Sequence, residues 1–204
     1  MLTFDPVPHE YKWSGRRVPS VTQLLDRLHS FAGVPMEILD AAKRRGSYVH
    51  DMCDADDAND LADPDAELAG QYGGYLLAWR KFRADYAPEW AGTEERGYSE
   101  RYGFAGTLDN RGTLGKFGVV KWIIDKKTSA QTHPVWGMQV AAYRQLVAER
   151  DPSWLMARRA TVRLAADGTY KFDEWQDPGD WPAFQSLLTL QQWCTRNRIK
   201  EQQQ

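Results

Sequence analysis

The chain has 204 residues, 42% of them hydrophobic, which is enough to bury the core of one globular domain. Its formal net charge of −2 excludes a chain that is basic overall. Residues 51–67 hold eight acidic and no basic residues, so the remainder is basic and DNA binding stays open. The two cysteines, Cys53 and Cys194, are too few for a four-cysteine iron–sulfur cluster or zinc ribbon, and we expect neither.

No apolar run has the ~20 residues of a membrane span, and the N-terminal sequence does not resemble a signal peptide. We therefore expect a soluble, cytoplasmic protein with no membrane partner. In the N-terminal part, residues 11–18 predict a hairpin that turns at a Ser-Gly pair. Ser20 and Gln23 have the spacing of a capping box, which predicts that a helix begins there. Pro35 is expected in the first turn of a second helix, which runs to about His50 or beyond.

The acidic segment 51–67 is interpreted as a loop or a solvated helix end, because it lacks the ligand spacing and turn glycine of a calcium loop. A helix is predicted over residues 71–86, where aromatic residues recur at helical spacing. Core packing is the simpler interpretation of this stripe, and a platform for stacking bases is the alternative. The stripe consists of Tyr72, Tyr75, Leu76, Trp79 and Phe82.

The C-terminal part predicts three strands, a helix, a hairpin and a final helix. Their expected ranges are 92–99, 104–111, 119–125, 136–150, 161–175 and 181–197, followed by a polar tail at 200–204 that need not be ordered. The third strand is the most apolar and is expected at the centre of the sheet. The outline predicts an α/β or α+β layered fold, and we take the fold class as α/β, with a mixed central β-sheet flanked by α-helices, in a single domain over residues 1–204.

Two acids and a lysine follow neighbouring strands of this predicted sheet. Asp109 ends one strand, and Asp125 and Lys127 end the next. Residues two apart on a strand face the same side, so Asp125 and Lys127 share a site while Lys126 faces away. The carboxylates could bind Mg²⁺ or Mn²⁺, and the ammonium could accept a proton or stabilise charge on a phosphate. The alternative is a strand-end aspartate beside a solvated lysine.

Two further pairs lie four residues apart on predicted helices. Gln139 and Tyr143 could orient a lysine or contact a phosphate, or could be a solvated glutamine beside a half-buried tyrosine. Gly46 permits close approach on the face that carries His50, whose imidazole could complete a metal shell or be a satisfied buried histidine.

Six short motifs follow one another along the chain. Because of these motifs and their order, the chain resembles the RecB-like branch of the PD-(D/E)XK nuclease superfamily, specifically the phage-type exonucleases. The resemblance covers roughly residues 9–143. The motifs are HEY…GRRVPSVT at 9–22, RGSYVH at 45–50, TE at 93–94, GFAGTLD at 103–109, IIDKKTS at 123–129 and QVAAY at 139–143. Two departures are Lys121-Trp122 in the apolar strand and Asn110-Arg111 after Asp109.

The resemblance implies a restriction-endonuclease-like core and Mg²⁺-dependent hydrolysis of DNA, with Mn²⁺ as a possible substitute. It implies His50, Asp109 and Asp125 as metal ligands, with the backbone carbonyl of Lys126 as a possible fourth. Lys127 corresponds to the catalytic lysine. The remaining implied site residues are Glu94 as the upstream acid (with Glu95 and Glu100 as alternatives), Gln139 and Tyr143 as the helix motif, and Thr128 and Ser129 as phosphate contacts. Five basic residues could guide the DNA backbone or could simply be solvated: Arg16, Arg17, Lys43, Arg44 and Arg45.

The expected function is that of a DNA exonuclease acting from a 5′ end in phage-type recombination or replication. A recombinase or a single-strand-binding protein is a possible partner. The alternatives are a non-catalytic DNA-binding accessory protein and an endonuclease of the same fold. Polarity, strand preference and oligomeric state stay open.

Overall fold

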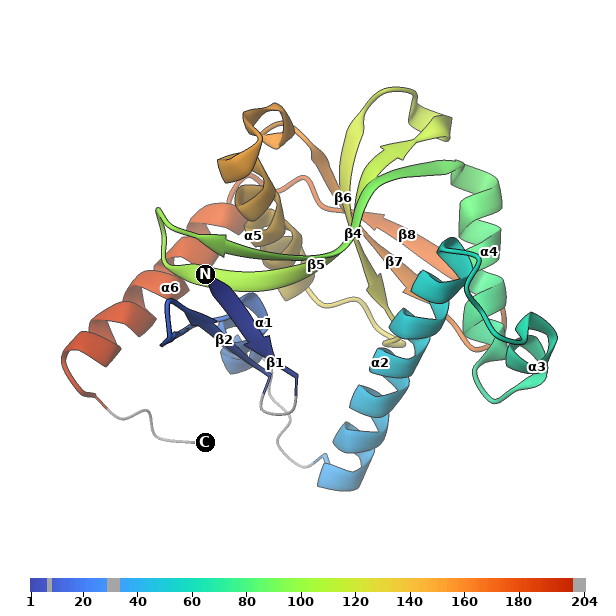
Figure 1. Ribbon diagram of the computed structural model, residues 1–204, viewed down its shortest axis with the longest axis horizontal. Helices are drawn as coiled ribbons and strands as arrows, with labels where there is room; N and C mark the ends of the chain where they lie inside the picture. The colour runs from blue at the N-terminus through green and yellow to red at the C-terminus, as the bar shows by residue number, and fades with distance from the viewer. Residues whose placement is uncertain (7–8, 29–33, 200–204) are drawn as a thin grey trace.

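A mixed five-stranded sheet forms the centre of the protein, as the computed structural model shows (Figure 1). The strands lie in the order β4 (Pro88–Ser99), β5 (Phe104–Leu114), β6 (Lys121–Lys127), β7 (Arg158–Leu164) and β8 (Tyr170–Glu174). Only β6 and β7 are parallel, and the other neighbours are antiparallel. The predicted meander, the central third strand and the later hairpin are thus confirmed.

The structure describes residues 1–6, 9–28 and 34–199. The predicted polar tail at 200–204 lies outside these residues. Within them, no helix has the length and apolar character that crossing a bilayer requires.

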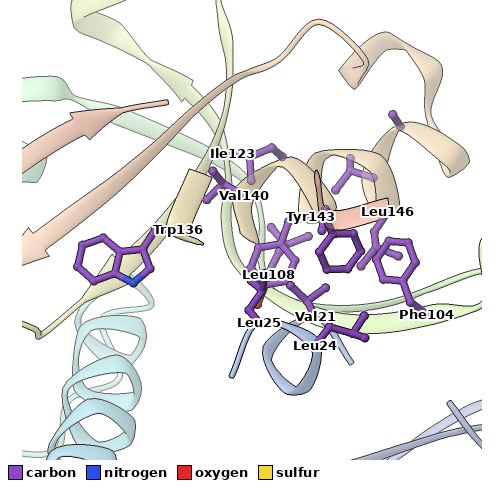
Figure 2. Packing of buried hydrophobic residues seen from close by; sticks show 14 of the residues in the cluster. Val21, Leu24, Leu25, Phe104, Leu108, Ile123, Trp136, Val140, Tyr143 and Leu146 are labelled. Carbon is purple, nitrogen blue, oxygen red and sulfur yellow. The ribbon is translucent and has the colours of Figure 1, made fainter. Parts of the chain in front are cut away.

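One face of the sheet is covered by α5 (Val135–Arg150), α6 (Asp180–Arg196) and the short α1 (Val21–Leu25). α5 connects the parallel strands β6 and β7, which need such a crossover because a tight turn cannot join them. Figure 2 shows Val21, Leu24 and Leu25 packing toward the side chains of α5 and β5. The predicted helices over 136–150 and 181–197 are confirmed within one residue at each end.

The other face is covered by α2 (Met36–Asp57) and α4 (Gly73–Tyr86), with α3 (Pro64–Ala69) between them in sequence. Trp79 and Phe82 are fully buried on α4, which confirms that the aromatic stripe packs in the core. Alternation along β6 supplies both faces: Ile123 packs on the α5 side, whereas Trp122 and Ile124 pack on the α4 side.

A separate three-stranded sheet precedes this core. It consists of β1 (Leu2–Asp5), β2 (Glu10–Trp13) and β3 (Arg16–Val18), so the predicted hairpin is confirmed and gains a third strand. The capping box is confirmed, because Gln23 N donates to Ser20 Oγ at 3.2 Å and Ser20 N donates to Gln23 Oε1 at 3.3 Å. The described residues also form three 3₁₀ turns: η1 (Asp26–Leu28), η2 (Gly115–Phe117) and η3 (Pro152–Trp154).

Two of the residues that depart from the pattern, Arg111 and Trp122, have structural partners. Arg111 pairs with Glu95 and its guanidinium carbon lies 4.9 Å from the centre of the Trp154 ring. Trp122 is fully buried, with the guanidinium of Arg158 4.5 Å from its ring centre. These changes therefore affect packing away from the predicted site.

The interpretation of residues 51–67 as a loop or a solvated helix end is wrong for residues 51–57. α2 continues to Asp57, and Asp56 pairs with Arg80 and Arg83 of α4. Asp57 pairs with Arg83 and is only 8% exposed at its side chain. The sequence conceals this, because the cations that compensate the acids lie more than twenty residues further along the chain.

We expect Asp57→Ala to lower the free energy of unfolding by about 1–3 kcal/mol, the usual cost of leaving buried hydrogen-bonding groups unsatisfied, because Arg83 is part-exposed and keeps Asp56 as a partner. Asp57 accepts hydrogen bonds from the indole N–H groups of Trp79 and Trp90, both at 2.9 Å, and its loss leaves them unsatisfied. Urea denaturation measures the change. The control Asp60→Ala removes an exposed carboxylate and should shift stability by less than about 0.5 kcal/mol, so equal midpoints for the two variants would contradict the role of Asp57.

Candidate active site

Strands β5 and β6 separate where the predicted acids lie. Their ladder ends at the pair Asn110–Ile124, and the next residues on the two strands are Asp109 and Asp125. Beyond this point the amide N–H of Lys126 donates to Asp109 Oδ2 at 2.6 Å, so a side chain replaces the missing ladder bond. The separation opens space at the end of the sheet without leaving this buried amide unsatisfied.

A cavity of about 870 Å³ lies over this opening. Its floor is formed by polar residues of β4, β5 and β6, with α2 on one side and the start of α5 on the other. Every residue that the sequence assigned to the site lines it. The assigned residues that line it are His50, Glu94, Asp109, Asp125, Lys127, Gln139, Tyr143, Thr128, Ser129 and Arg45.

Asp125, Lys127, Gln139 and Tyr143 form one hydrogen-bonded network. Lys127 Nζ lies 2.6 Å from Asp125 Oδ2 and donates to Gln139 Oε1 at 2.8 Å. The amide nitrogen of Gln139 donates to Asp125 Oδ1 at 3.2 Å and to the Tyr143 hydroxyl at 3.0 Å. An ammonium has three N–H groups, so this arrangement fixes Lys127 and leaves one donor for the cavity, in which the side chain is 18% exposed.

His50 presents one ring nitrogen to the acids. Its Nε2 lies 3.0 Å from the carbonyl oxygen of Lys126, which can only accept, so Nε2 carries the proton and Nδ1 keeps its lone pair. Nδ1 lies 3.4 Å from Asp109 Oδ2. Burial, followed by the charge of Lys126, lowers the pKa of His50 to about 4, so the imidazole is neutral and suited to bind a metal.

Glu94 is the acid of β4 that reaches the cavity, and its backbone explains how. Its φ of +46° is uncommon for a residue with a side chain and costs of order 1–3 kcal/mol, which the surrounding strand must offset. Glu95 instead pairs with Arg111, and Glu100 is exposed in the turn after β4. The backbone conformation therefore separates three acids that the sequence could not distinguish.

The residues present fit a divalent metal ion. One ligand atom from each of His50, Glu94 and Asp109 lies within 4.8 Å of the others. This group shares His50 and Asp109 with the predicted ligand set but contains Glu94, because the carboxylate of Asp125 is engaged by Lys127 and Gln139. Two carboxylates and one imidazole suit Mn²⁺ well and Mg²⁺ acceptably. The predicted fourth ligand, the carbonyl of Lys126, bonds to His50 and keeps a second lone pair.

The electrostatics of the cavity floor favour added positive charge. Burial raises the pKa of Asp125 to about 6, although Lys127 opposes the shift, and burial also raises the pKa of Asp109. Desolvation, followed by repulsion from Asp109, raises the pKa of Glu94 to about 8. Carboxyl groups that resist ionisation in this way would be stabilised as carboxylates by a bound divalent cation.

The predicted DNA contacts lie higher on the cavity wall. Arg45 Nη2 is 3.5 Å from the carbonyl oxygen of Thr128, at the limit of a hydrogen bond. The Ser129 hydroxyl donates to the carbonyl of Gln131 at 3.2 Å. Gly46 faces Thr128, and a methyl group at Gly46 would lie 3.8 Å from the Thr128 hydroxyl, so the glycine leaves space there rather than avoiding a clash.

Sequence reasoning missed Asp54 and the side chain of Lys126. Lys126 is fully buried on the α2 side of β6, as its alternation predicted, and its ammonium pairs with Asp54. The charge of Asp54 also contributes to the raised pKa of Glu94. A signal was available: Asp54 lies one turn beyond His50 on the face of α2 that also carries Gly46.

No family model matches the chain, and no curated protein matches it. A solved structure described as "Crystal structure of SSO0001" is similar to it at 17% identity, with a TM-score of 0.37, over 89% of this chain and 85% of that chain. This likeness is too weak to support an argument, so the function has to be argued from the site.

Proposed function

We propose that this protein is a Mg²⁺-dependent deoxyribonuclease with a restriction-endonuclease-like core that hydrolyses DNA from its ends. One observation supports it above the others. A lysine held by an aspartate and a glutamine lies in the same cavity as a histidine and two acids spaced to hold a metal ion. The residues come from separate elements, α2, β4, β5, β6 and α5, and this convergence on one cavity favours a catalytic role over a surface role.

Each residue then has a role that its contacts support. His50, Glu94 and Asp109 would hold the ion, which when bound polarises a phosphate oxygen and promotes ionisation of water. Lys127 donates its remaining N–H to the scissile phosphate and stabilises the charge that develops there. Asp125 and Gln139 position Lys127, and Tyr143 orients Gln139 through its hydroxyl.

We expect Lys127→Met to lower the rate of Mg²⁺-dependent DNA cleavage by about 10²–10³-fold, the usual effect of losing one group that stabilises transition-state charge. The assay uses linear DNA labelled at its 5′ or its 3′ end, beside a covalently closed circle, with Mg²⁺ or with EDTA.

The supporting result is loss of linear DNA with Mg²⁺ only, with the circle intact and the variant inactive. The label that is released first gives the polarity. Nicking of the circle would replace the exonuclease with an endonuclease, and a variant as active as wild type would remove Lys127 from the mechanism.

A further inference from the structure

We propose that the cavity accepts one unpaired DNA strand rather than a duplex, and that Lys43 and Arg45 of α2 hold the phosphates of that strand. The proposal rests on the proposed function in taking DNA as the ligand. The additional support comes from the shape and charge of the first half of α2, which forms one wall of the cavity. Cleavage of a phosphodiester bond does not itself require this wall.

The first half of α2 is a wall that stands free of the core. α2 begins at Met36, and its buried residues begin at Val49. Fourteen residues of α2 precede His50, and at 1.5 Å each they extend about 21 Å beyond the metal-binding group. Figure 1 shows this part of α2 projecting away from the sheet, beside the N-terminal strands.

One face of this wall is turned to the cavity. Leu39, Ala42, Lys43, Gly46, Ser47 and His50 line it at the three- and four-residue spacings of one helix face. Arg45 and Asp51 line it from either side of that face. Across the cavity, His9, Tyr11 and Thr22 line the opposite side from β2 and α1 and the turn before them. The strand that reaches the floor therefore has to pass between α2 and the N-terminal part of the chain.

The depth of the acids favours a single strand at the floor. Asp125 is 2% exposed and Asp109 is 7% exposed, so a phosphate has to descend into the cavity to reach them. A volume of about 870 Å³ is that of a small-ligand site. A few nucleotides of one unpaired strand suit such a space better than a duplex does.

The charge of the wall matches a phosphate backbone. Lys43 and Arg45 form no ion pair with any residue in the described part of the chain. Most other buried or half-buried arginines of the protein are paired, as Arg80 with Asp56 and Arg159 with Asp180 show. Unpaired cations along a cavity wall above an anion-processing site are suited to backbone phosphates.

The test measures binding in EDTA, so that no strand is cut and nuclease activity is not needed. A fluorescein-labelled oligothymidine is compared with a blunt duplex of equal length, for wild type, the double variant Lys43→Gln/Arg45→Gln, and Arg44→Gln. Arg44 is the matched control, because it lies between the two residues in sequence and does not line the cavity.

We expect wild type to bind the single strand at least ~10-fold more tightly than the duplex, and the double variant to lose ~10-fold of that affinity. The slope of log affinity against log salt should fall by about 1.4 for two lost phosphate contacts to a single strand. Arg44→Gln should change neither. Equal affinity for the blunt duplex, or an equal loss in Arg44→Gln, would overturn the proposal.

Cleavage in Mg²⁺ separates this proposal from the proposed function. Single-strand preference without cleavage of any substrate would retain the strand-binding wall and remove the nuclease. Cleavage of a blunt duplex and a tailed duplex at equal rates, unaffected by the double variant, would retain the nuclease and remove the strand-binding wall.

Discussion

The Asp125→Asn variant is expected to cleave linear DNA on the order of 10³-fold more slowly than wild type while remaining folded. The substitution keeps the shape of the side chain but removes the charge that holds Lys127 Nζ at 2.6 Å. It also disturbs the bond from Gln139 at 3.2 Å, so both groups that position the lysine are affected. The assay is the same end-labelled DNA digestion in Mg²⁺.

The same variant should change how stability depends on pH in metal-free protein. The folded protein raises the pKa of Asp125 to about 6 from an ordinary value of 3.8, so it binds the proton more tightly than the unfolded chain. The stability that this proton confers is fully present below about pH 4 and is lost as the pH rises to about 6. At about 1.4 kcal/mol per pKa unit, the loss is about 3 kcal/mol. Urea denaturation in EDTA from pH 4 to pH 7 should show this loss in wild type and a smaller one in Asp125→Asn.

Asp167→Asn is the control for both measurements. Asp167 lies in the turn between β7 and β8, and its hydrogen bonds to Thr169 lower its pKa, the opposite direction from Asp125. This variant should cleave at the wild-type rate. If Asp125→Asn cleaved DNA at the wild-type rate, Asp125 would have no role in the site. If its stability changed with pH as that of wild type does, the pKa of Asp125 would not be raised in the metal-free protein.

The elements could be predicted from sequence because each one satisfies a local rule. The capping box at Ser20 and the turn of the β7–β8 hairpin are local patterns, and the structure reproduces both. The burial of β6 on both faces follows from its run of apolar residues, which only a central strand requires. For the same reason the alternation of Asp125, Lys126 and Lys127 placed their side chains on the correct sides.

The parts of the site that could not be predicted depend on partners distant in sequence. Asp54 belongs to an acidic run that is solvated by any local criterion, and its partner Lys126 lies seventy-two residues away. Glu94 was distinguishable from Glu95 only through a backbone conformation with positive φ, which no residue preference announces for a glutamate. Ion pairs between residues distant in sequence and strained backbone conformations are thus the two features that sequence patterns do not reveal here.

The largest change in stability is expected at the buried pair of Lys126 and Asp54. Asp54→Ala should lower the free energy of unfolding by about 3–5 kcal/mol, because it removes the carboxylate that pairs with the fully buried ammonium of Lys126. Lys126→Met should cost much less, since a residue of similar volume replaces the charge and Asp54, 20% exposed at its side chain, can turn to water. The carboxylates around Lys126 outweigh the effect of burial and raise its pKa, so the lysine does not escape the cost by losing its proton.

This asymmetry distinguishes a buried charge from a simple packing contact, and the double variant Lys126→Met/Asp54→Ala completes the comparison. It should be more stable than Asp54→Ala alone, because removal of the lysine also removes the buried charge. Urea denaturation in EDTA of the three variants and wild type gives the coupling directly. If Asp54→Ala were as stable as Lys126→Met, the pair would not be ionic in the folded protein.

The amide and carbonyl of Lys126 that contact Asp109 and His50 belong to the backbone and survive in Lys126→Met. Any loss of Mg²⁺ affinity in that variant would therefore come from α2, which carries His50 and would no longer be held to β6 by Asp54.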